Sequence, residues 1–366
     1  MSRPLRIAIE WRALSETPSH FALLRELSAR GGHPILALLE PPCPAGNSGP
    51  IKTHPVRRRF RIHPTVSFLT GWKRPLETFQ PDVFLGLEEP YSIQSPAFLR
   101  WARKYRVPLI LLTCQNIERS LPFPFEHVER TVLAGASGLW CLNSEAEQRA
   151  RRRGFRGVSR VIPLGTDLPA RVTERAGPSE TFTVGYVGRL AREKGVSDLI
   201  AAAARVGARV VVAGAGPEEG ALRGLARRLG VSADWLGWRS GESLAKVYPL
   251  LDALALPSHT TPTWKEQFGR VLIEAMGTGV PVVGSDSGEI PRVIGEAGLI
   301  YPEGDIAALT ERLGRLQHDR GLWKDLSKRG VERVRDRFTW ERISGMLGEL
   351  IEETLARAVS PEAKKG

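Results

Sequence analysis

The stretch TWKEQFGRVLIEAMGTGVPVVGSDSG, residues 263–288, decides the fold of this chain. It carries two carboxylates, Glu266 and Glu274, eight positions apart. Between them, residues 267–270 are typical of a helix start, residues 271–276 form a short apolar helix, and residues 280–284 predict a buried strand. At about 1.5 Å per helical residue, eight positions span at most about 12 Å. Two carboxylates that far apart do not share one proton or one metal ion. They can instead bind the two ends of one extended ligand.

The start of this helix offers an anion site between the two carboxylates. The first backbone N–H groups of a helix have no partner within the helix, and they bind anions. A ligand with hydroxyls at both ends and phosphate in the middle therefore fits. A nucleotide-sugar meets this description, with its ribose on one glutamate, its hexose on the other and its diphosphate on the helix start. The alternative is a surface loop with two solvated glutamates.

Outward from this stretch, strand-like and helix-like segments alternate along all 366 residues. That pattern favours the α/β class, with parallel sheets covered by helices, in two doubly wound Rossmann-like domains that face a cleft. Expected strands in the first half are residues 5–9, 34–39, 82–87, 108–113, 138–142 and 159–163. Expected strands in the second half are residues 183–187, 209–213, 253–256, 281–284 and 299–301. Two helices, residues 321–337 and 340–359, are expected to end the chain.

The composition indicates a cytoplasmic protein whose first half is basic. Three cysteines without paired spacing favour a reducing compartment, and no apolar run approaches the roughly 20 residues of a membrane span. The net charge is +12, and residues 1–170 hold 24 Lys and Arg against 14 Asp and Glu. The excess, concentrated in Arg57, Arg58, Arg59 and Arg61 and in residues 149–160, indicates an anionic partner of that half. The alternative is a compositional preference for arginine on solvated faces.

A second motif, GYVGRLAREKG at residues 185–195, has the form of a strand, a glycine turn and a helix start with two cations. Gly188 lets the backbone approach a ligand closely. Arg189 offers a planar fork to phosphate, and Lys194 adds a point charge. The alternative is that both cations are solvated loop residues. No His or Cys cluster has metal-ligand spacing, so we expect no metal and no cofactor.

These motifs, with VVVAGAGPEEGALRGLA at residues 210–226 and the run from Leu256 to Asp305, resemble the C-terminal half of group 1 glycosyltransferases. That is the retaining family 4, with the GT-B fold. The resemblance implies that Arg189 and Lys194 hold the donor diphosphate, that Glu274 takes the ribose and that Glu266 takes the transferred sugar. It further implies that backbone at Phe268, Gly269, Arg270 and Val271 contacts sugar and phosphate. Trp238 and Arg239 would then lie beside the nucleobase.

The same resemblance divides the chain into three segments. Residues 1–168 would be the acceptor-side domain, residues 169–338 the nucleotide-sugar-binding domain, and residues 339–366 a helix that crosses back to the first domain. Glu88 and Glu89 follow the expected strand at residues 82–87. Gln115 and Asn116 follow the expected strand at residues 108–113, where many members carry a histidine. We expect these four residues on the acceptor side.

The predicted activity is metal-independent, retaining transfer of a hexose from a UDP- or GDP-sugar to a hydroxyl acceptor, in cell-envelope polysaccharide or glycolipid synthesis. The expected partners are the nucleotide-sugar donor, a glycan or lipid-linked acceptor and, peripherally, the inner face of an anionic membrane, without nucleic acid. Two alternatives stay open. One is a nucleotide-sugar epimerase or hydrolase of the same fold. The other is a protein that binds an anionic surface or nucleic acid through its basic half.

Overall fold

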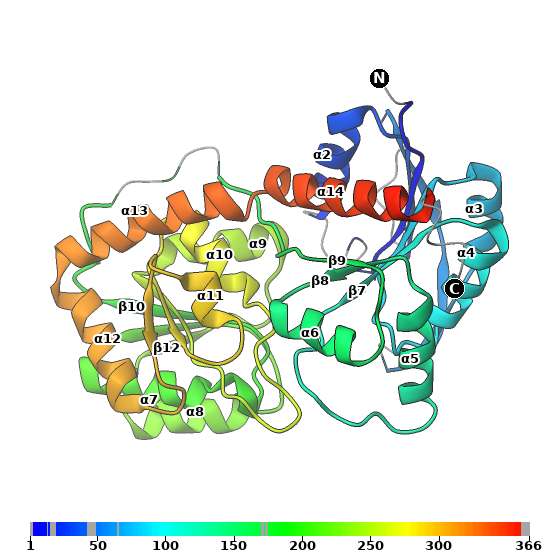
Figure 1. Cartoon of the computed structure of the whole chain (residues 1–366). Coiled ribbons are helices and arrows are strands. Elements are labelled where there is room, and N and C mark those ends of the chain that lie inside the picture. Colours follow the sequence, from blue (N-terminus) through cyan, green and yellow to red (C-terminus); the bar gives the residue numbers. More distant parts are fainter. Residues whose placement is uncertain are drawn as a thin grey trace. The chain divides into compact units, whose positions relative to one another are not determined.

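Two parallel sheets form the centres of two compact units (Figure 1). The computed structural model describes residues 3–12, 14, 20–41, 49–63, 66–169, 172 and 175–359. The first unit consists of Met1–Gly165 with Trp340–Gly366, and the second consists of Thr166–Thr339.

The first unit is built on a seven-stranded sheet. Its strands are β1 (Ile7–Glu10), β2 (Ile35–Leu39), β3 (Ile51–Pro55), β6 (Val83–Gly86), β7 (Leu109–Thr113), β8 (Gly138–Cys141) and β9 (Val158–Val161). They lie in the order β3-β2-β1-β6-β7-β8-β9, and all neighbours are parallel. A separate antiparallel hairpin joins β4 (Arg57–His63) to β5 (Val66–Thr70). The order reverses direction at β1, as in doubly wound sheets.

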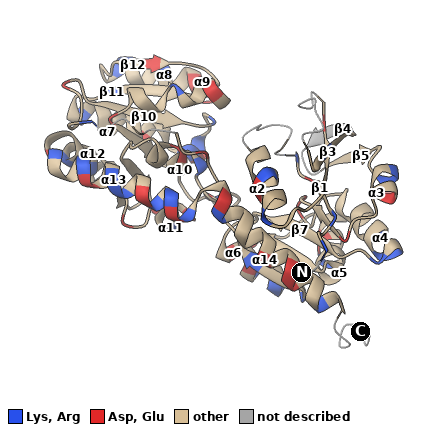
Figure 2. Ribbon diagram, turned by 90° about the horizontal axis from the view of Figure 1, so that it is seen from above, with Lys and Arg blue, Asp and Glu red and all other residues tan. Residues whose placement is uncertain are grey.

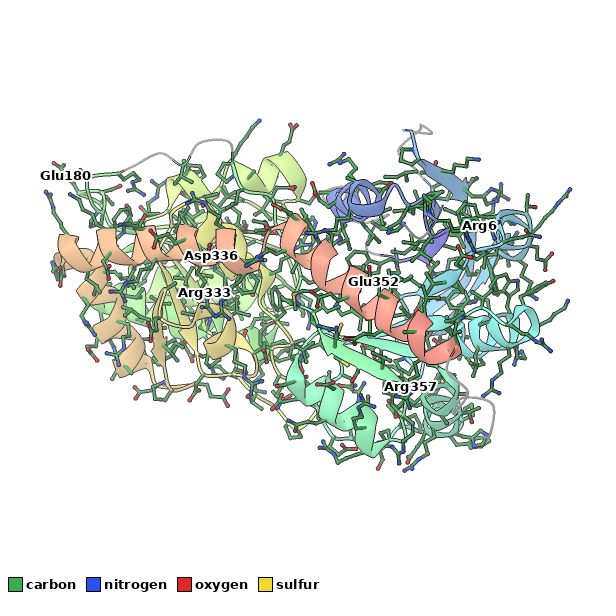
Figure 3. The ribbon with its side chains drawn as sticks, turned by 45° about the horizontal axis from the view of Figure 1, so that its top comes forward. Arg6, Glu180, Arg333, Asp336, Glu352 and Arg357 are labelled. Atoms are coloured by element: carbon green, nitrogen blue, oxygen red, sulfur yellow. The ribbon has the colours of Figure 1, made fainter. Side chains whose placement is uncertain are left out.

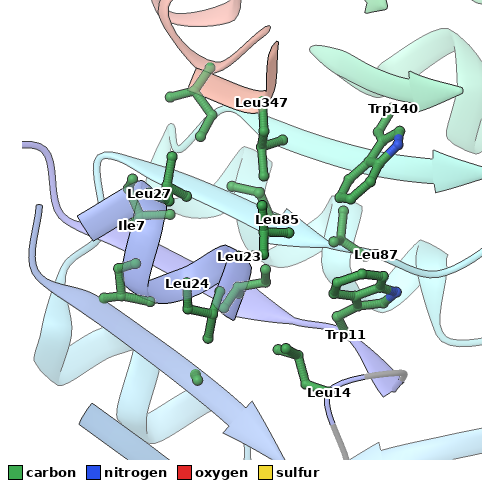
Figure 4. Close-up of a cluster of buried hydrophobic side chains, with 14 of the residues drawn as sticks. Ile7, Trp11, Leu14, Leu23, Leu24, Leu27, Leu85, Leu87, Trp140 and Leu347 are labelled. Carbon is green, nitrogen blue, oxygen red and sulfur yellow. The ribbon is translucent and has the colours of Figure 1, made fainter. Parts of the chain in front are cut away.

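Helices cover both faces of this sheet. They are α2 (Phe21–Gly31), α3 (Lys73–Phe79), α4 (Ser95–Tyr105), α5 (Phe125–Gly135), α6 (Ser144–Arg152) and α14 (Trp340–Val359). On one face, alternate strand residues such as Ile7 and Leu85 pack with Leu23 of α2 and Leu347 of α14 (Figure 4). The opposite face packs against α3, α4 and α5. Because strand side chains alternate between the two covered faces, most positions of the inner strands are apolar and buried.

The second unit repeats the same plan with six strands. They are β10 (Thr183–Val187), β11 (Arg209–Ala213), β12 (Ala233–Trp235), β13 (Ala253–Leu256), β14 (Val282–Ser285) and β15 (Leu299–Tyr301), in the order β12-β11-β10-β13-β14-β15. Its helices are α7 (Val196–Val206), α8 (Glu219–Arg228), α9 (Gly241–Ala245), α10 (Arg270–Gly277), α11 (Ile290–Ile294), α12 (Ile306–His318) and α13 (Arg320–Arg337). Short 3₁₀ turns form η2 (Arg192–Lys194) and η3 (Tyr248–Leu250).

The architecture confirms the predicted α/β class with two parallel sheets. The strands β3, β4, β5 and β12 were not predicted, because their residues are polar, basic or few. The last helix packs within the first unit, where it contacts α2, β8 and β9. In the part of the chain that the structure describes, no helix is long and apolar enough to span a bilayer.

Candidate functional site

The carboxyl edge of the second sheet brings the two predicted motifs together. Strands β10 and β13 are neighbours, although β11 and β12 lie between them in sequence. The chain leaves β10 on one side toward β11 and returns on the other side in β13. Such a switch point opens a crevice beyond the carboxyl ends of the strands, where ligands bind in doubly wound folds. The loop with Gly188 and Lys194 follows β10, and the loop that reaches Glu266 follows β13.

Lys194 and Glu266, from these two loops, form an ion pair. Lys194 Nζ lies 2.8 Å from Glu266 Oε2, and the hydroxyl of Ser258 donates to the same oxygen at 3.0 Å. The ammonium also lies 4.2 Å from the ring centre of Trp264, which is a cation–π contact. Glu266 is only 8% exposed. The pair therefore places one cation and one anion side by side in a largely desolvated position, where their interactions with a ligand are strong.

The backbone holds Glu266 from behind. The N–H of Glu289 donates to the Glu266 carbonyl at 3.1 Å. Gly288, at a φ of +56°, approaches so closely that a β-carbon there would lie 2.1 Å from that oxygen. Only glycine tolerates both the left-handed conformation and this contact. The position of Glu266 thus depends on a turn that follows β14.

Glu274, on α10, is held by two other groups. Arg270 Nε lies 2.9 Å from its Oε1, and the hydroxyl of Tyr248 donates to its Oε2 at 2.5 Å. Burial, followed by the charge of Glu274, raises the pKa of Tyr248 well above its usual value, so the phenol stays a donor. Both carboxylate oxygens are therefore oriented before any ligand arrives.

The start of α10 lies between Glu266 and Glu274 in sequence, and it has the predicted form. Gly269 precedes the helix at a φ of +82°, a left-handed conformation that favours glycine. The amides of the first helical turn, at Arg270 and Val271, have no partner within the helix. Phe268 contributes backbone only, because its side chain is buried against Phe338.

Three other residues predicted at the donor site make no contact with Glu266 or Glu274. Arg189 forms an ion pair with Glu193 four residues later, and its side chain is 55% exposed. Trp238 is 66% exposed, and Arg239 is exposed beside it, in the loop that follows the edge strand β12. All three side chains are at the surface, where a ligand can reach them.

The sequence did not predict two contacts of His259 that hold the turn containing Lys194. His259 Nε2 lies 2.7 Å from Asp198 Oδ2, and the His259 backbone N–H donates to the Glu193 carbonyl at 2.8 Å. These contacts fasten η2 and the start of α7 to the loop after β13. Trp264 could have been predicted at this site, because it lies within the motif at residues 263–288. No such signal existed for Tyr248, Ser258 and His259, whose partners are distant in sequence.

In the first unit, the predicted acceptor-side residues gather at the carboxyl ends of β6 and β7. Glu89 accepts hydrogen bonds from the Thr113 hydroxyl at 2.9 Å and from the Cys114 N–H at 2.8 Å. Burial raises the pKa of Glu89 to about 7. Gln115 and Asn116 are buried in the following loop. The strand ends thus bring Glu89 to the loop that contains both amides.

Glu88 belongs to a buried network that the sequence did not predict. Arg58, from β4, donates to Glu88 at 2.7 Å, to Glu40 at 2.7 Å and to Glu10 at 3.0 Å. Glu10 is 1% exposed. Burial and then the Glu88 charge raise its pKa to about 8.

Several arginines that the sequence assigned to contact with an anionic partner are instead buried. Arg58 is buried with three carboxylates, and Arg149 and Arg153 are buried in pairs with Glu129 and Glu126. Their charges are neutralised inside the first unit and do not reach an anionic partner. The side chain of Arg61 lies outside the described residues. Of the four arginines in the run, Arg57 and Arg59 are exposed.

Within the described ranges, no group of three or more His, Cys, Asp or Glu residues could hold a metal ion. The second unit presents paired charges, the amides at the start of α10 and surface cations at this edge. An arrangement of this kind suits a phosphate-bearing ligand with hydroxyls.

Comparison with solved structures defines the architecture as GT-B. The chain superposes on sucrose-phosphate synthase from Thermosynechococcus elongatus with a TM-score of 0.75, at 21% identity over 97% of this chain and 100% of that one. It superposes on Anabaena HepE in complex with UDP and glucose with a TM-score of 0.72, at 17% identity over 95% and 99%. At these identities the likeness concerns the fold.

The family match lies within the second unit. Residues 173–333 match the family described as Glycosyl transferases group 1. Over 245 residues, the chain is 31% identical to D-inositol 3-phosphate glycosyltransferase from Corynebacterium jeikeium, which is 59% of this chain and 57% of that protein. The chain spans about half the length of the curated relatives that it matches. The matched residues include every donor-side position described above.

Proposed function

We propose that this protein transfers a hexose from a nucleotide-diphosphate sugar to a hydroxyl acceptor, with retention of configuration and without a metal ion. The observation that carries the proposal is the Lys194–Glu266 pair at the switch point, joined by α10 to the oriented carboxylate of Glu274. A carboxylate on each side of free helix amides matches a sugar, a diphosphate and a ribose in that order.

In the proposed reaction, the acceptor oxygen forms a bond to the anomeric carbon as the bond from that carbon to the phosphate oxygen breaks. The acceptor proton passes to a phosphate oxygen of the leaving nucleoside diphosphate. Negative charge grows on that diphosphate, so preorganised donors accelerate the step. Lys194 and the amides of Arg270 and Val271 are the fixed donors. Arg189 is exposed and can exchange Glu193 for phosphate.

The two glutamates have different proposed roles. Glu274 takes the ribose hydroxyls, because Arg270 and Tyr248 hold it at the far end of the first helical turns. Glu266 takes hydroxyls of the transferred hexose and also fixes Lys194. Trp238 and Arg239 are proposed to meet the nucleobase. Because a structural neighbour was solved with UDP and glucose, UDP-sugars are the first donors to test.

On the acceptor side, we propose that Glu89, Gln115 and Asn116 lie beside the approach of the hydroxyl. Glu88 is engaged by Arg58 and is proposed to support this edge from within. The acceptor is proposed to belong to a cell-envelope glycan or glycolipid, met on the cytoplasmic side of a membrane. Because Arg58, Arg149 and Arg153 are buried, any contact with that membrane would have to involve other cations of the first unit.

Product analysis tests the proposal. UDP- and GDP-hexoses are incubated in EDTA with and without a panel of sugar and lipid-linked acceptors. Glycoside and free nucleoside diphosphate should appear only with acceptor, and the new linkage should keep the donor's anomeric configuration. Release of free sugar without acceptor would instead identify a hydrolase, and a changed nucleotide-sugar would identify an epimerase. Activity that EDTA abolishes and a divalent ion restores would contradict the metal-free reaction.

Glu266→Ala separates the roles of the glutamates. It should leave affinity for free UDP nearly intact and depress turnover, because its proposed partner is the hexose. Loss of UDP binding in a folded variant would show that the two roles are reversed. Lys194 loses its partner in this variant, so Glu266→Gln serves as the matched control that keeps the volume and a hydrogen-bonding group.

A further inference from the structure

Consecutive residues of the loop after β13 hold both members of the Lys194–Glu266 pair. The Ser258 hydroxyl donates to Glu266 Oε2 at 3.0 Å. The backbone N–H of the next residue, His259, donates at 2.8 Å to the carbonyl of Glu193, which lies in η2 beside Lys194. One short loop therefore sets the distance between the carboxylate and the turn from which the ammonium reaches it.

The ring of His259 makes a second contact with the same region. Its Nε2 lies 2.7 Å from Oδ2 of Asp198, in the first turn of α7. A carboxylate only accepts hydrogen bonds, so Nε2 carries the hydrogen and donates it. Asp198 is 8% exposed, and a hydrogen bond to an ionised acceptor is among the stronger kinds. The bond therefore fixes the rotation of the imidazole ring.

The helix α7 is a firm anchor for this bond. Leu199, Ile200 and Ala203 are buried, and α12 packs along α7 (Figure 2). Side chains on packed helices hold a geometry more precisely than side chains on loops. The Asp198–His259 bond therefore ties the loop after β13 to a part of the second unit that packing keeps in place.

Close backbone contact passes the position of His259 on to the turn that carries Lys194. At Gly195, the residue after Lys194, a β-carbon would lie 1.9 Å from the Pro257 carbonyl oxygen and 2.9 Å from Nε2 of His259. The φ of Gly195, +62°, is also a left-handed value that favours glycine. The turn thus packs directly against the ring and the loop, so a displaced imidazole ring displaces the backbone of Lys194.

We propose that His259 is a positioning residue for the transfer reaction, which fixes the turn of Lys194 so that the ammonium meets the leaving diphosphate. The inference rests on the proposed function and adds to it a residue that does not itself touch the donor. Displacement of a catalytic group by about 1 Å can cost about 10²-fold in rate. His259 therefore contributes through Lys194, and Asp198 in turn orients His259.

Steady-state kinetics of His259→Ala and His259→Gln test the proposal. His259→Ala removes the bond to Asp198, so turnover should fall by about 10- to 100-fold, whereas the KM for the donor should change by less than about threefold. The amide nitrogen of a glutamine reaches nearly as far from the backbone as Nε2 does, and it also donates to a carboxylate. His259→Gln should therefore recover turnover to within about threefold of the wild-type value.

The deciding comparison places His259→Ala in a Lys194→Ala background. If His259 acts through Lys194, its loss there should lower turnover by less than about twofold, because the effects of coupled residues are not additive. The control is Arg333→Ala. Arg333, labelled in Figure 3, donates from α13 to the carbonyls of Val293 and Arg292 at 2.7 and 2.6 Å, so its loss loosens the same unit elsewhere. Turnover of this control should stay within about twofold of the wild-type value.

Three kinetic results would overturn the proposal. The first is full turnover in His259→Ala. The second is an undiminished further loss when His259→Ala is added to Lys194→Ala. The third is an equal loss of turnover in Arg333→Ala, which would mean that general loosening of the unit explains the effect.

A wild-type chain that transfers no sugar would instead contradict the proposed function, and hydrogen exchange then decides the positioning role. The amides of Gly195 and Asp198 donate to the carbonyls of Arg192 and Gly195 at 3.2 and 2.9 Å. Both amides should exchange faster in His259→Ala and recover their protection in His259→Gln. Unchanged exchange of these amides in His259→Ala would overturn the inference, whatever the activity of the wild-type chain.

Discussion

The two units of this protein share the order of six parallel strands, to which the first unit adds β9, and they differ in the side chains at the carboxyl edge of the sheet. In the second unit, the switch point presents Lys194 paired with Glu266, and Glu274 held by Arg270 and Tyr248. In the first unit, the corresponding edge buries Glu10 and Glu88, with Glu40 from the end of β2, around Arg58. One sheet edge offers charges to a ligand, whereas the other surrounds a cation with carboxylates.

The difference shows that topology locates a site but does not supply its chemistry. In the second unit, Glu266 pairs with Lys194 and Ser258, and Glu274 pairs with Arg270 and Tyr248, so each carboxylate has its own cation and hydroxyl. In the first unit, three carboxylates share one guanidinium. Burial, followed by the charge of Glu88, raises the pKa of Glu10 to about 8. We propose that the second edge contacts a charged ligand. The first edge is arranged to hold the β4–β5 hairpin against the sheet.

The largest expected effect concerns Arg58. Arg58→Ala leaves three buried carboxylates without their cation, and breaking such a network typically costs about 3–5 kcal/mol. Urea unfolding of the full chain should show this loss, and hydrogen exchange should locate it in β1 and β6 rather than in β10 and β13. The control Arg57→Ala, at an exposed neighbouring position, should change the free energy of unfolding by less than about 0.5 kcal/mol. An equal, small effect of both variants would contradict the contrast between the units.

Lys194→Ala should give the largest catalytic effect. Loss of one preorganised donor on the leaving diphosphate lowers turnover by about 10²–10³-fold. The measurement is steady-state kinetics with the donor and acceptor found by product analysis. Lys328→Ala, which removes an exposed lysine from α13, is the control and should retain full turnover. A Lys194→Ala enzyme with near-normal turnover would remove Lys194 from the mechanism.

The buried carboxylates of the first unit predict a dependence of stability on pH. Their pKa values, about 8 for Glu10 and about 7 for Glu89, lie above the value near 4.3 of an unfolded chain. Below about pH 4, both states are protonated and there is no penalty. Between about pH 4.5 and 8, the unfolded state ionises first, so folding stability falls as the pH rises, by up to about 1.4 kcal/mol for each unit that separates the folded from the unfolded pKa.

Hydrogen exchange in β1 and β6 at pH 5.5 and pH 8, corrected for the intrinsic rate, measures this effect, with β10 and β13 as internal reference. Glu89→Gln should flatten the dependence, because an amide does not ionise. Unchanged protection of β1 and β6 across this range would contradict the raised pKa values and with them the described burial.

The sequence predicted the second unit better than the first, for a physical reason. The expected strands 183–187, 209–213, 253–256 and 299–301 coincide with β10, β11, β13 and β15, because both faces of each strand are apolar. Lys194 and Glu266 were both expected at the donor site, and the structure joins them. The contacts of Tyr248 and Ser258 could not be predicted from the sequence, because only the order of the strands brings their loops beside α10 and Glu266.

In the first unit, Arg58 was expected to face an anionic partner together with its neighbours in the arginine run, but its side chain is buried. Residues of a strand alternate between faces, so Arg58 points inward when Arg57 and Arg59 point outward. Consecutive arginines do not show in the sequence which of them faces inward. The carboxylates that bind Arg58, those of Glu10, Glu40 and Glu88, lie at the ends of three separate strands. The same alternation hid β3, whose Lys52 and His54 interrupt the apolar pattern of an edge strand.

The most direct test of the central claim is a calorimetric titration of UDP and GDP into the wild-type chain, Glu274→Ala and Glu10→Gln. The account predicts one saturable nucleotide site per chain. It predicts that Glu274→Ala weakens that site by about 1.5–3 kcal/mol, the value of hydrogen bonds to a charged group, whereas Glu10→Gln in the first unit leaves it unchanged. Absence of saturable binding by either nucleotide, or full affinity in a folded Glu274→Ala variant, would contradict the assignment of the donor site to the second unit.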